Sequence, residues 1–385
     1  MRIAGRDITF VQVLDLEKAA KVAASDLEKA TKELAEVRVA AGEGEKSRQA
    51  AAALGAELGE LKGKFAEVEA GYKKEMTLRK KYYNIIEDMK GKIRVYCRVR
   101  PFNKMEREKG SVYATFFPDD MTIEVQTSRD KKSFTFDQCF QSNSTQEAVF
   151  EDTQNLIQSA MDGYNVCIFA YGQTGAGKTH TMYGNPEMPG IAPRAMSELF
   201  RLVEENRGTF ETRVRCYMVE LYNDGLVDLL KAKKDEEKPL TIKQDAKGIV
   251  FVQGATIQEC ATLDDLIRFQ QYGDGQRHVA ATAMNAVSSR SHLIFSILVE
   301  AKNVTTGVAS VGKLTLVDLA GSERAGKTGA TGDRLKEAQS INMSLSALGD
   351  VIGCLSSGEK FVPYRNNKLT MLLQVSPRLS CACCF

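Results

Sequence analysis

The stretch Gly172-Gln173-Thr174-Gly175-Ala176-Gly177-Lys178-Thr179 decides the fold of this chain. It follows the apolar run 166–171 and precedes a segment able to form a helix. Glycines at this spacing let successive backbone N–H groups turn inward and surround phosphate oxygens at a helix N-terminus. In such a P-loop, Lys178 reaches the β- and γ-phosphates and the Thr179 hydroxyl ligates Mg²⁺. The alternative is a glycine-rich surface loop with an ordinary lysine, but the strand-like run before it favours a nucleotide site.

A P-loop needs further groups that respond to the γ-phosphate. Asp318 ends the apolar run Lys313–Leu319 and is placed to hold the metal through water, as a Walker-B acid does. It opens the segment 318–323, in which the Gly321 N–H could approach the γ-phosphate. The polar cluster Asn285–His292 opens another strand-like run. Taken singly these segments are weak indications, because a serine-rich loop is usually only a turn.

The chain beyond Gly91 has the texture of an α/β domain. Short runs of β-branched and aromatic residues alternate with helix-like segments and glycine-rich turns; the runs are Lys92–Val99, Asn165–Tyr171, Arg213–Leu221, Leu293–Glu300 and Lys313–Leu319. This alternation predicts one large domain with a central sheet that helices cover on both faces.

The segment before Gly91 has a different composition, without proline between Leu16 and Met89. Apolar residues recur there in alternating steps of four and three, at Leu16, Ala20, Ala23, Leu27, Ala30, Leu34, Val37 and Ala41, and in a shifted phase from Leu54 to Tyr72. The heptad spacing predicts a left-handed coiled coil over residues 16–90, with a phase change at residues 42–44, after an N-terminal extension of residues 1–15. The alternative is a single amphipathic helix packed on its own domain.

Bulk composition excludes several classes of function. The net charge is only +2, so no overall excess points to nucleic acid or to an acidic membrane. The three histidines lie far apart without metal-ligand spacing, and no run approaches the roughly 20 apolar residues of a membrane span. Six of the nine cysteines are scattered, mostly in apolar runs, which favours reduced, buried thiols and a cytosolic or nuclear compartment.

Taken together, the motifs resemble the kinesin motor head. The P-loop, the Ser288–His292 element and the Asp318–Glu323 element occur in kinesin order and at kinesin-like separations. The opening Arg98-Val99-Arg100-Pro101 and the later Tyr364–Thr370 are also similar to that family. The resemblance implies a P-loop NTPase-like α/β head, a central mixed sheet flanked by helices, that binds ATP and Mg²⁺ and hydrolyses ATP on microtubules.

The resemblance also implies roles for single residues. Ser288 and Ser289 would lie in switch I, where they contact Mg²⁺ and the γ-phosphate. Arg290 would pair with Glu323 when the two switches close, a contact that positions the attacking water. Hydrolysis of this kind needs no covalent intermediate, because charge that develops on the phosphate is spread over Lys178, Mg²⁺ and backbone donors such as Gly321.

The base and the track have expected partners as well. Arg98, Arg100 and Pro101 resemble the residues that flank the adenine, with His180 stacked on its other side. The expected microtubule contacts are Lys327, Arg334, Lys336, Arg365 and Lys368, with Lys243 and Lys247 as a second patch. Tubulin is acidic, so such a cluster would hold it in a salt-sensitive way, although each residue singly fits an ordinary surface charge. Met343 stands where the family usually has lysine.

The junction Leu78–Arg94 is similar to the neck of kinesin-14 motors, closest to the calmodulin-binding kinesins of plants and green algae. This resemblance implies a minus-end-directed motor on cytoplasmic microtubules, and the heptad pattern of residues 16–90 predicts that it is a dimer. After Gln374 the chain passes to Val375-Ser376-Pro377 and stops. We therefore expect a motor domain of residues 91–374 without the family's last strand and helix, an atypical tail of residues 375–385, and no calmodulin partner.

Two other functions remain open from sequence. A head that lacks a central strand favours a microtubule-binding coiled-coil protein that cannot complete the ATPase cycle. The intact Lys178, Thr179, Arg290, Asp318 and Glu323 favour an active motor instead. An unrelated P-loop ATPase or GTPase is the weakest reading, because the motifs around the switches are specific.

Overall fold

The computed structural model describes residue 22 and residues 25–36, 45–89, 93–232, 239–246, 248–283, 289–323, 332–374 and 380–384. Within these, only the backbone is described at residues 45–48, 72–73, 75–89, 278–283, 333–334 and 380–384. The chain divides into two compact units, Met1–Met89 and Lys90–Phe385. None of the helices among the described residues combines the length and the apolar character needed to cross a membrane.

The first unit is helical. Residues 25–36 form one helix and α2 spans Glu45–Met89. Leu34 and Leu58, both on the predicted apolar stripe, are each only 7% exposed. The coiled coil over residues 16–90 and its pairing with a second chain stay predictions. The expected phase change at residues 42–44 lies outside the described residues.

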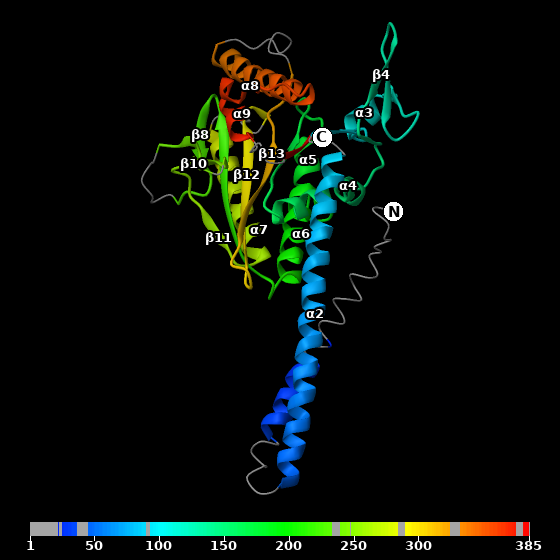
Figure 1. Cartoon of the computed structure of the whole chain (residues 1–385). Coiled ribbons are helices and arrows are strands. Elements are labelled where there is room, and N and C mark those ends of the chain that lie inside the picture. Colours follow the sequence, from blue (N-terminus) through cyan, green and yellow to red (C-terminus); the bar gives the residue numbers. More distant parts are fainter. Residues whose placement is uncertain are drawn as a thin grey trace. The chain divides into compact units, whose positions relative to one another are not determined.

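The second unit is built on one mixed sheet, in the order β11-β7-β12-β13-β6-β14-β1-β5, with β8 beside β7 (Figure 1). Its strands are β1 (Ile93–Arg98), β5 (Gln138–Phe140), β6 (Asn165–Ala170), β7 (Phe210–Tyr222), β8 (Gly225–Asp228), β11 (Gln258–Cys260), β12 (His292–Asn303), β13 (Ala309–Asp318) and β14 (Ser380–Cys384). The strands β13, β6, β14, β1 and β5 run parallel, whereas β7, β11 and β12 pair in antiparallel fashion. All five strand-like runs predicted from sequence are confirmed within a few residues of their expected ends.

Helices cover both faces of this sheet, as expected. One face packs against α4 (Gln146–Met161), α6 (Ile191–Glu205) and α7 (Leu263–Ala283), and the other packs against α8 (Asp333–Ser356) and α9 (Lys368–Leu372), which follows η3 (Tyr364–Asn366). Apolar residues at helical spacing explain the choice of face. In α8, for example, Leu345 and Leu348 are 9% and 5% exposed while Met343 is 63% exposed.

Shorter elements complete the unit. They are α3 (Lys104–Glu108), α5 (Lys178–Met182), the three-stranded sheet β2 (Thr115–Phe116), β3 (Thr122–Gln126) and β4 (Lys131–Thr135), and the hairpin β9 (Thr241–Gln244) with β10 (Val250–Gln253). The small three-stranded sheet projects from the body of this unit (Figure 1).

The expectation that the sheet lacks a central strand is wrong. Strand β14, formed by residues assigned from sequence to an atypical tail, lies between β6 and β1 and is parallel to both. Ala382 pairs with Cys167 on one side and with Ile93 on the other. A central slot between two strands demands backbone donors and acceptors more than particular side chains, because unpaired backbone groups there are costly. A short segment of small residues therefore fills it.

Candidate functional site

The P-loop joins β6 to α5 at the carboxyl end of the parallel strands. Strand β13 is the neighbour of β6, and Asp318 at its end is in register with Ala170. Gly175 and Gly177 adopt positive φ angles of 79° and 98°, which other residues rarely tolerate. The loop therefore presents its amides at the edge of an α/β sheet where ligands of such folds bind.

Lys178 is folded back over the loop that carries it. Its Nζ donates to the carbonyl oxygens of Gly172 at 2.9 Å and Gln173 at 3.1 Å. Burial lowers the pKa of this amine, while the nearby carboxylates of Asp318 and Glu323 act in the opposite direction. The ammonium group is thus held beside the amides of the P-loop, where a phosphate group would add charge-assisted hydrogen bonds.

Thr179 and Asp318 meet directly, although they lie on different elements. The Thr179 hydroxyl donates to Oδ2 of Asp318 at 2.6 Å. The other carboxylate oxygen, Oδ1, is buried without a hydrogen-bond partner, and burial raises the pKa of this carboxyl group. A buried carboxylate oxygen with an unused lone pair next to a hydroxyl is a donor set that fits Mg²⁺ and its water ligands.

The loop after β13 lies on the P-loop. The Ser322 N–H donates to the Gly172 carbonyl at 3.1 Å. The carboxylate of Glu323 accepts from the Thr174 N–H at 2.9 Å and from the Thr174 hydroxyl at 2.6 Å. The Gly321 N–H, expected to approach a γ-phosphate, donates to the Ser289 carbonyl at 2.9 Å instead. The expected switch segments therefore contact the P-loop and each other.

Arg290 and Glu323 do not pair with each other in this structure. Arg290 Nη1 lies 2.7 Å from Oε2 of Glu337 on α8, while Glu323 is bonded to Thr174. The expected pairing in a closed state stays a prediction. Ser288, the other expected switch residue, lies outside the described residues.

The residues expected around the adenine line one cleft of about 330 Å³ beside the P-loop. Its walls include Arg98, Arg100, Pro101, Gly177 and His180. The cleft therefore brings together segments that are about 80 residues apart in sequence, and it opens next to the phosphate-binding loop.

Gln146, which sequence reasoning missed, holds this cleft together. It is 4% exposed; its Oε1 accepts from Arg98 Nη1 at 2.8 Å, and its Nε2 donates to the His180 carbonyl at 2.8 Å. Arg98 Nη1 also donates to the Thr181 hydroxyl at 3.0 Å. The only sequence feature nearby is the cap of α4, where the Thr145 side chain accepts from the Ala148 N–H.

Arg100 is fixed at the mouth of the cleft by Glu106. The two side chains form a paired hydrogen bond, and this guanidinium, with the Asn103 backbone N–H, lowers the pKa of Glu106 to about 2. Asn103 and Glu106 also form a capping box at the start of α3. A short helix thus orients the arginine, a role that its sequence did not reveal.

A buried network of charged and polar side chains connects α7, β7 and the segment that enters β12. Arg277 on α7 forms an ion pair with Glu220 at 3.2 Å and approaches Oδ2 of Asp318 at 3.8 Å. Ser291 donates to Glu220 and accepts from Arg277 at 3.2 Å. Sequence reasoning missed Arg277 and Glu220, because nothing in their local pattern distinguishes them from surface charges.

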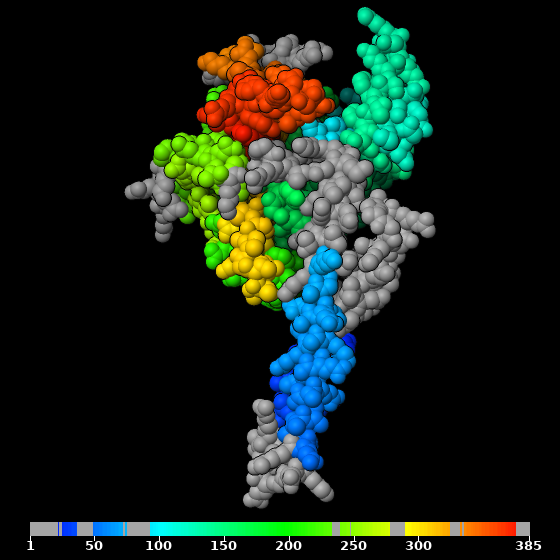
Figure 2. Space-filling view, in the orientation of Figure 1, coloured from blue at the N-terminus to red at the C-terminus, as the bar shows by residue number. Residues whose placement is uncertain are grey.

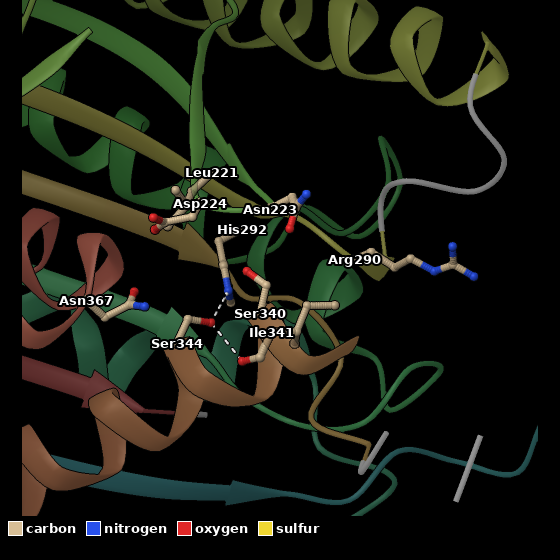
Figure 3. Close-up of a pocket in the computed structure, with 9 residues that line it drawn as sticks. All are labelled: Leu221, Asn223, Asp224, Arg290, His292, Ser340, Ile341, Ser344 and Asn367. Carbon is tan, nitrogen blue, oxygen red and sulfur yellow. Dashed lines mark hydrogen bonds between the residues drawn. The ribbon is translucent and has the colours of Figure 1, made fainter. Parts of the chain in front are cut away.

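His292 links β12 to α8 and to the loop after β13. Its Nδ1 accepts from the Ala320 N–H at 3.1 Å, so its Nε2 carries the proton and donates to the Ser344 hydroxyl at 2.8 Å. The Ser344 hydroxyl in turn donates to the Ile341 carbonyl (Figure 3). Burial lowers the pKa of His292 to about 3, so the ring is neutral.

The expected track residues that the structure describes lie on α8 and the segment that follows it, except for Lys243 of the second patch, which lies on β9. Lys336, Arg365 and Lys368 are exposed, and Lys368 Nζ donates to the Asp224 carbonyl at 2.6 Å. Of the others, Lys327 and Lys247 lie outside the described residues, and Arg334 is described by its backbone alone in α8. The helix α8, orange to red, forms a prominent exposed ridge of this unit (Figure 2).

Comparison with known proteins decides the family. The model of the kinesin motor domain matches residues 98–382, which include the P-loop, both switch segments and most of β14. The chain belongs to the kinesin family. The kinesin match thus extends beyond Gln374, where the motor domain was expected to stop.

Curated relatives place this kinesin near plant kinesin-14 proteins. It is 48% identical to the kinesin-like protein KIN-14E of Arabidopsis thaliana over 96% of the chain and 31% of that protein. It is 50% identical to KIN-14I of Oryza sativa subsp. japonica over 91% of the chain and 28% of that protein. The chain spans less than a third of the length of these curated relatives.

Solved kinesin structures share the fold. The motor and motor homology domain of Kar3Vik1, fused to a synthetic heterodimeric coiled coil, matches 88% of this chain and 92% of that one at 36% identity, with a TM-score of 0.73. A fast kinesin matches 76% of this chain and 84% of that one at 39% identity, with a TM-score of 0.69. The α/β head with a central mixed sheet flanked by helices, expected from the sequence, is confirmed.

Proposed function

We propose that this kinesin is an ATP-hydrolysing microtubule motor of the kinesin-14 type that moves toward microtubule minus ends. The observation that carries the proposal is the direct contact of Thr179 with Asp318 beside the folded-back Lys178, at the ends of two neighbouring parallel strands. This is the arrangement that a P-loop NTPase needs to bind a nucleotide and its metal.

ATP would bind with its base in the cleft of Arg98, Arg100, Pro101 and His180. Its phosphates would lie against the amides of residues 172–179, where Lys178 would leave its carbonyl partners for the β- and γ-phosphates. Thr179, Asp318 and Ser288 would hold Mg²⁺, which fits the unpaired buried oxygen of Asp318. When bound, this ion neutralises charge on the phosphate oxygens.

Hydrolysis would follow closure of the two switch segments. Arg290 would leave Glu337, and Glu323 would leave Thr174, so that the two could pair and orient a water molecule in line with the γ-phosphate. The Gly321 N–H would leave the Ser289 carbonyl and face the γ-phosphate. Each proposed step replaces hydrogen bonds of the present structure with new ones; Glu323 alone would give up two, both from Thr174.

The proposed track surface is α8 with η3 and the start of α9. It carries Lys336, Arg365 and Lys368 on exposed positions, to which Lys327 and Arg334 would add. Tubulin is acidic, so attachment would weaken as salt screens the charges. We place the motor on cytoplasmic microtubules as a dimer joined through the apolar stripe of its first unit.

ATP turnover by the 385-residue chain tests the proposal, measured at low salt with and without microtubules. We expect microtubules to stimulate turnover, and Lys178→Ala to reduce it by at least about 100-fold through the loss of one charged phosphate contact. Lys302→Ala, an exposed lysine at the far end of β12, is the matched control and should keep full activity. If microtubules do not alter ATP turnover, the proposal that this chain is a microtubule motor is wrong.

Direction needs a separate measurement. Polarity-marked microtubules gliding over surface-bound chain should move with their plus ends leading, because a minus-end motor fixed to the surface drives its track in that sense. Gliding with the minus ends leading would refute the directional part of the proposal and leave the ATPase intact. The filled position of β14 favours an active head over one that cannot complete its cycle.

A further inference from the structure

Glu337 joins three segments of the head that lie far apart in sequence. It stands on α8; its Oε2 accepts from Arg290 at 2.7 Å, and its Oε1 accepts from the Tyr222 hydroxyl at 2.6 Å. Tyr222 ends β7, and Arg290 lies in the segment that enters β12. The side chains of Glu337 and Arg290 are 17% and 30% exposed, so the pair is partly screened from water.

Arg290 lies at the border of a small pocket that His292, Ser344 and Asn367 also line. In Figure 3 it extends away from His292 and out of the group formed by the other labelled side chains. Its backbone is continuous with Ser291, which the buried Arg277 and Glu220 hold in place. The side chain can therefore exchange one carboxylate partner for another while its backbone stays anchored.

Both partners of the proposed closing contact are engaged elsewhere. Arg290 is held by Glu337, and Glu323 is held by two hydrogen bonds from Thr174. One guanidinium in a partly buried site cannot serve two carboxylates on different elements with full strength at once. Closure of the switches must therefore draw Arg290 away from α8.

We propose that Glu337 is a positioning residue that holds Arg290 on α8 and so prevents closure of the switches until α8 shifts. The proposal rests on the proposed ATPase function. Glu337 neighbours Lys336 on α8, the helix that carries part of the proposed track surface. Attachment to a track would thus act on hydrolysis through a single carboxylate, without touching the nucleotide.

Tyr222 makes the release of Arg290 feasible. A partly buried carboxylate that loses its cation is costly unless another donor remains. The Tyr222 hydroxyl is that donor, and it bonds the oxygen that Arg290 does not use. Glu337 therefore keeps one hydrogen bond after Arg290 departs. Release of Arg290 thus costs one ion pair, but it does not leave the Glu337 carboxylate without any donor.

The decisive experiment measures the hydrolysis step alone, in a single turnover by excess 385-residue chain stopped with acid. Glu337→Gln keeps an oxygen that accepts from Tyr222 and removes the charge that holds Arg290. We expect this variant to hydrolyse ATP about fivefold faster than wild type without microtubules, and at the wild-type rate with saturating microtubules. Loss of a merely structural contact would slow the reaction or leave it unchanged, not accelerate it.

Asp350→Asn is the matched control, since it removes one negative charge from an exposed position on the same helix. It should leave the microtubule-free rate at the wild-type value. Raised salt gives a second readout: screening of the Arg290–Glu337 pair should accelerate hydrolysis in wild type and have no such effect in Glu337→Gln.

A microtubule-free rate in Glu337→Gln at or below that of wild type would overturn the proposal, provided that thermal unfolding shows a folded variant. If Glu337→Gln does not fold, Glu337→Asp serves in its place, because the shorter side chain keeps its charge but draws it back from Arg290. An accelerated rate supports the proposal and any other rate contradicts it. If wild type hydrolyses no ATP in either condition, both this proposal and the proposed function fail.

Discussion

The cleft proposed to bind the base and the proposed switch region adjoin the same P-loop, yet they are held together in different ways. In the cleft, buried Gln146 fixes Arg98 and the backbone of His180 to each other across β1, α4 and α5. In the switch region, Arg290 and Glu323 are bonded to partners that they must leave for hydrolysis to proceed as proposed. The contacts of the cleft fit its proposed role in binding, and those of the switch region fit the proposed exchange of partners.

The energies of the contacts agree with this division. Buried hydrogen bonds to a charged group contribute about 1.5–3 kcal/mol, and a partner left unpaired in the interior costs more. Partly exposed ion pairs contribute about 0–1 kcal/mol and are weakened by salt. The Arg290–Glu337 pair is of the second kind and can be exchanged for another pair at little cost, which a reaction cycle requires. Substitutions on the two sides should therefore affect different steps.

The largest effect is expected at Gly321, in the switch region. A Cβ there would lie 2.4 Å from the Thr174 hydroxyl oxygen and 2.4 Å from Oε2 of Glu323. Gly321→Ala should push the loop off the P-loop and misplace the donor proposed to face the γ-phosphate. We expect turnover with microtubules to fall by about 100-fold while nucleotide affinity changes little, as measured by steady-state kinetics and fluorescent nucleotide binding.

Gly349→Ala provides the comparison for that variant. Gly349 lies within α8, and a Cβ there would meet nothing within 4 Å. This variant should keep wild-type turnover and gain roughly 0.5–1 kcal/mol of stability, because alanine is the better helix former. Equal activities of Gly321→Ala and wild type would contradict this prediction. They would show that turnover does not depend on the position of the loop that contains Gly321.

A smaller effect, on binding instead of turnover, is expected at Gln146. Gln146→Leu fills similar space but leaves Arg98 and His180 without their bridge. We expect nucleotide affinity to fall about tenfold, the equivalent of one lost hydrogen bond in a buried site, with kcat at saturating ATP unchanged. Titration with a fluorescent nucleotide, together with kcat, separates the two quantities.

Gln158→Leu on the same helix is the control for this variant. Gln158 donates to Asp162, near the other end of α4, and does not line the cleft. Its substitution should leave affinity at the wild-type value. A fall in kcat with unchanged affinity in Gln146→Leu would contradict the division, because it would assign the cleft a part in the catalytic step.

Local sequence patterns were sufficient to predict the parts of the head whose geometry is local. The P-loop needs only its glycines, Lys178 and Thr179 in succession, and the apolar runs on either side fix the strands beside it. In these cases the physical cause acts over one turn of helix or one strand, so the sequence contains it in readable form.

Contacts between distant segments could not be predicted in this way. Gln146 and Glu337 are polar residues on helices, and nothing in their neighbourhoods marks one as a bridge and the other as a partner of Arg290. The prediction that the sheet lacks a central strand was wrong for a related reason. Expectation followed the family's usual sequence, whereas pairing of a central strand depends on backbone groups that many sequences can supply.

The smallest expected effect is a change in stability with pH that arises from His292, a buried residue beside the proposed switch segments. Its ring must be neutral, because Nδ1 accepts from Ala320. Burial, followed by the charges of Arg277 and Lys178, lowers its pKa to about 3, below the usual 6.5. A histidine with a depressed folded-state pKa contributes stability that is present above the unfolded-state pKa and is lost as pH falls below it. Between pH 7.5 and pH 6 the chain should therefore lose about 0.8 kcal/mol of unfolding free energy through this residue.

Urea unfolding of wild type and His292→Asn at both pH values measures this contribution by difference, so that other titrating groups cancel. The variant should be less stable at pH 7.5 and should lack this part of the pH dependence. His180→Asn should remove a smaller part, because burial lowers the pKa of this exposed histidine less than that of His292. If His292→Asn retains the wild-type pH dependence, the ring is not held neutral between Ala320 and Ser344. The proposed switch region would then lack a rigid support near Arg290 and Glu323. The difference from the cleft, which buried Gln146 holds in place, would then include the buried residues of the switch region as well as its partly exposed ones.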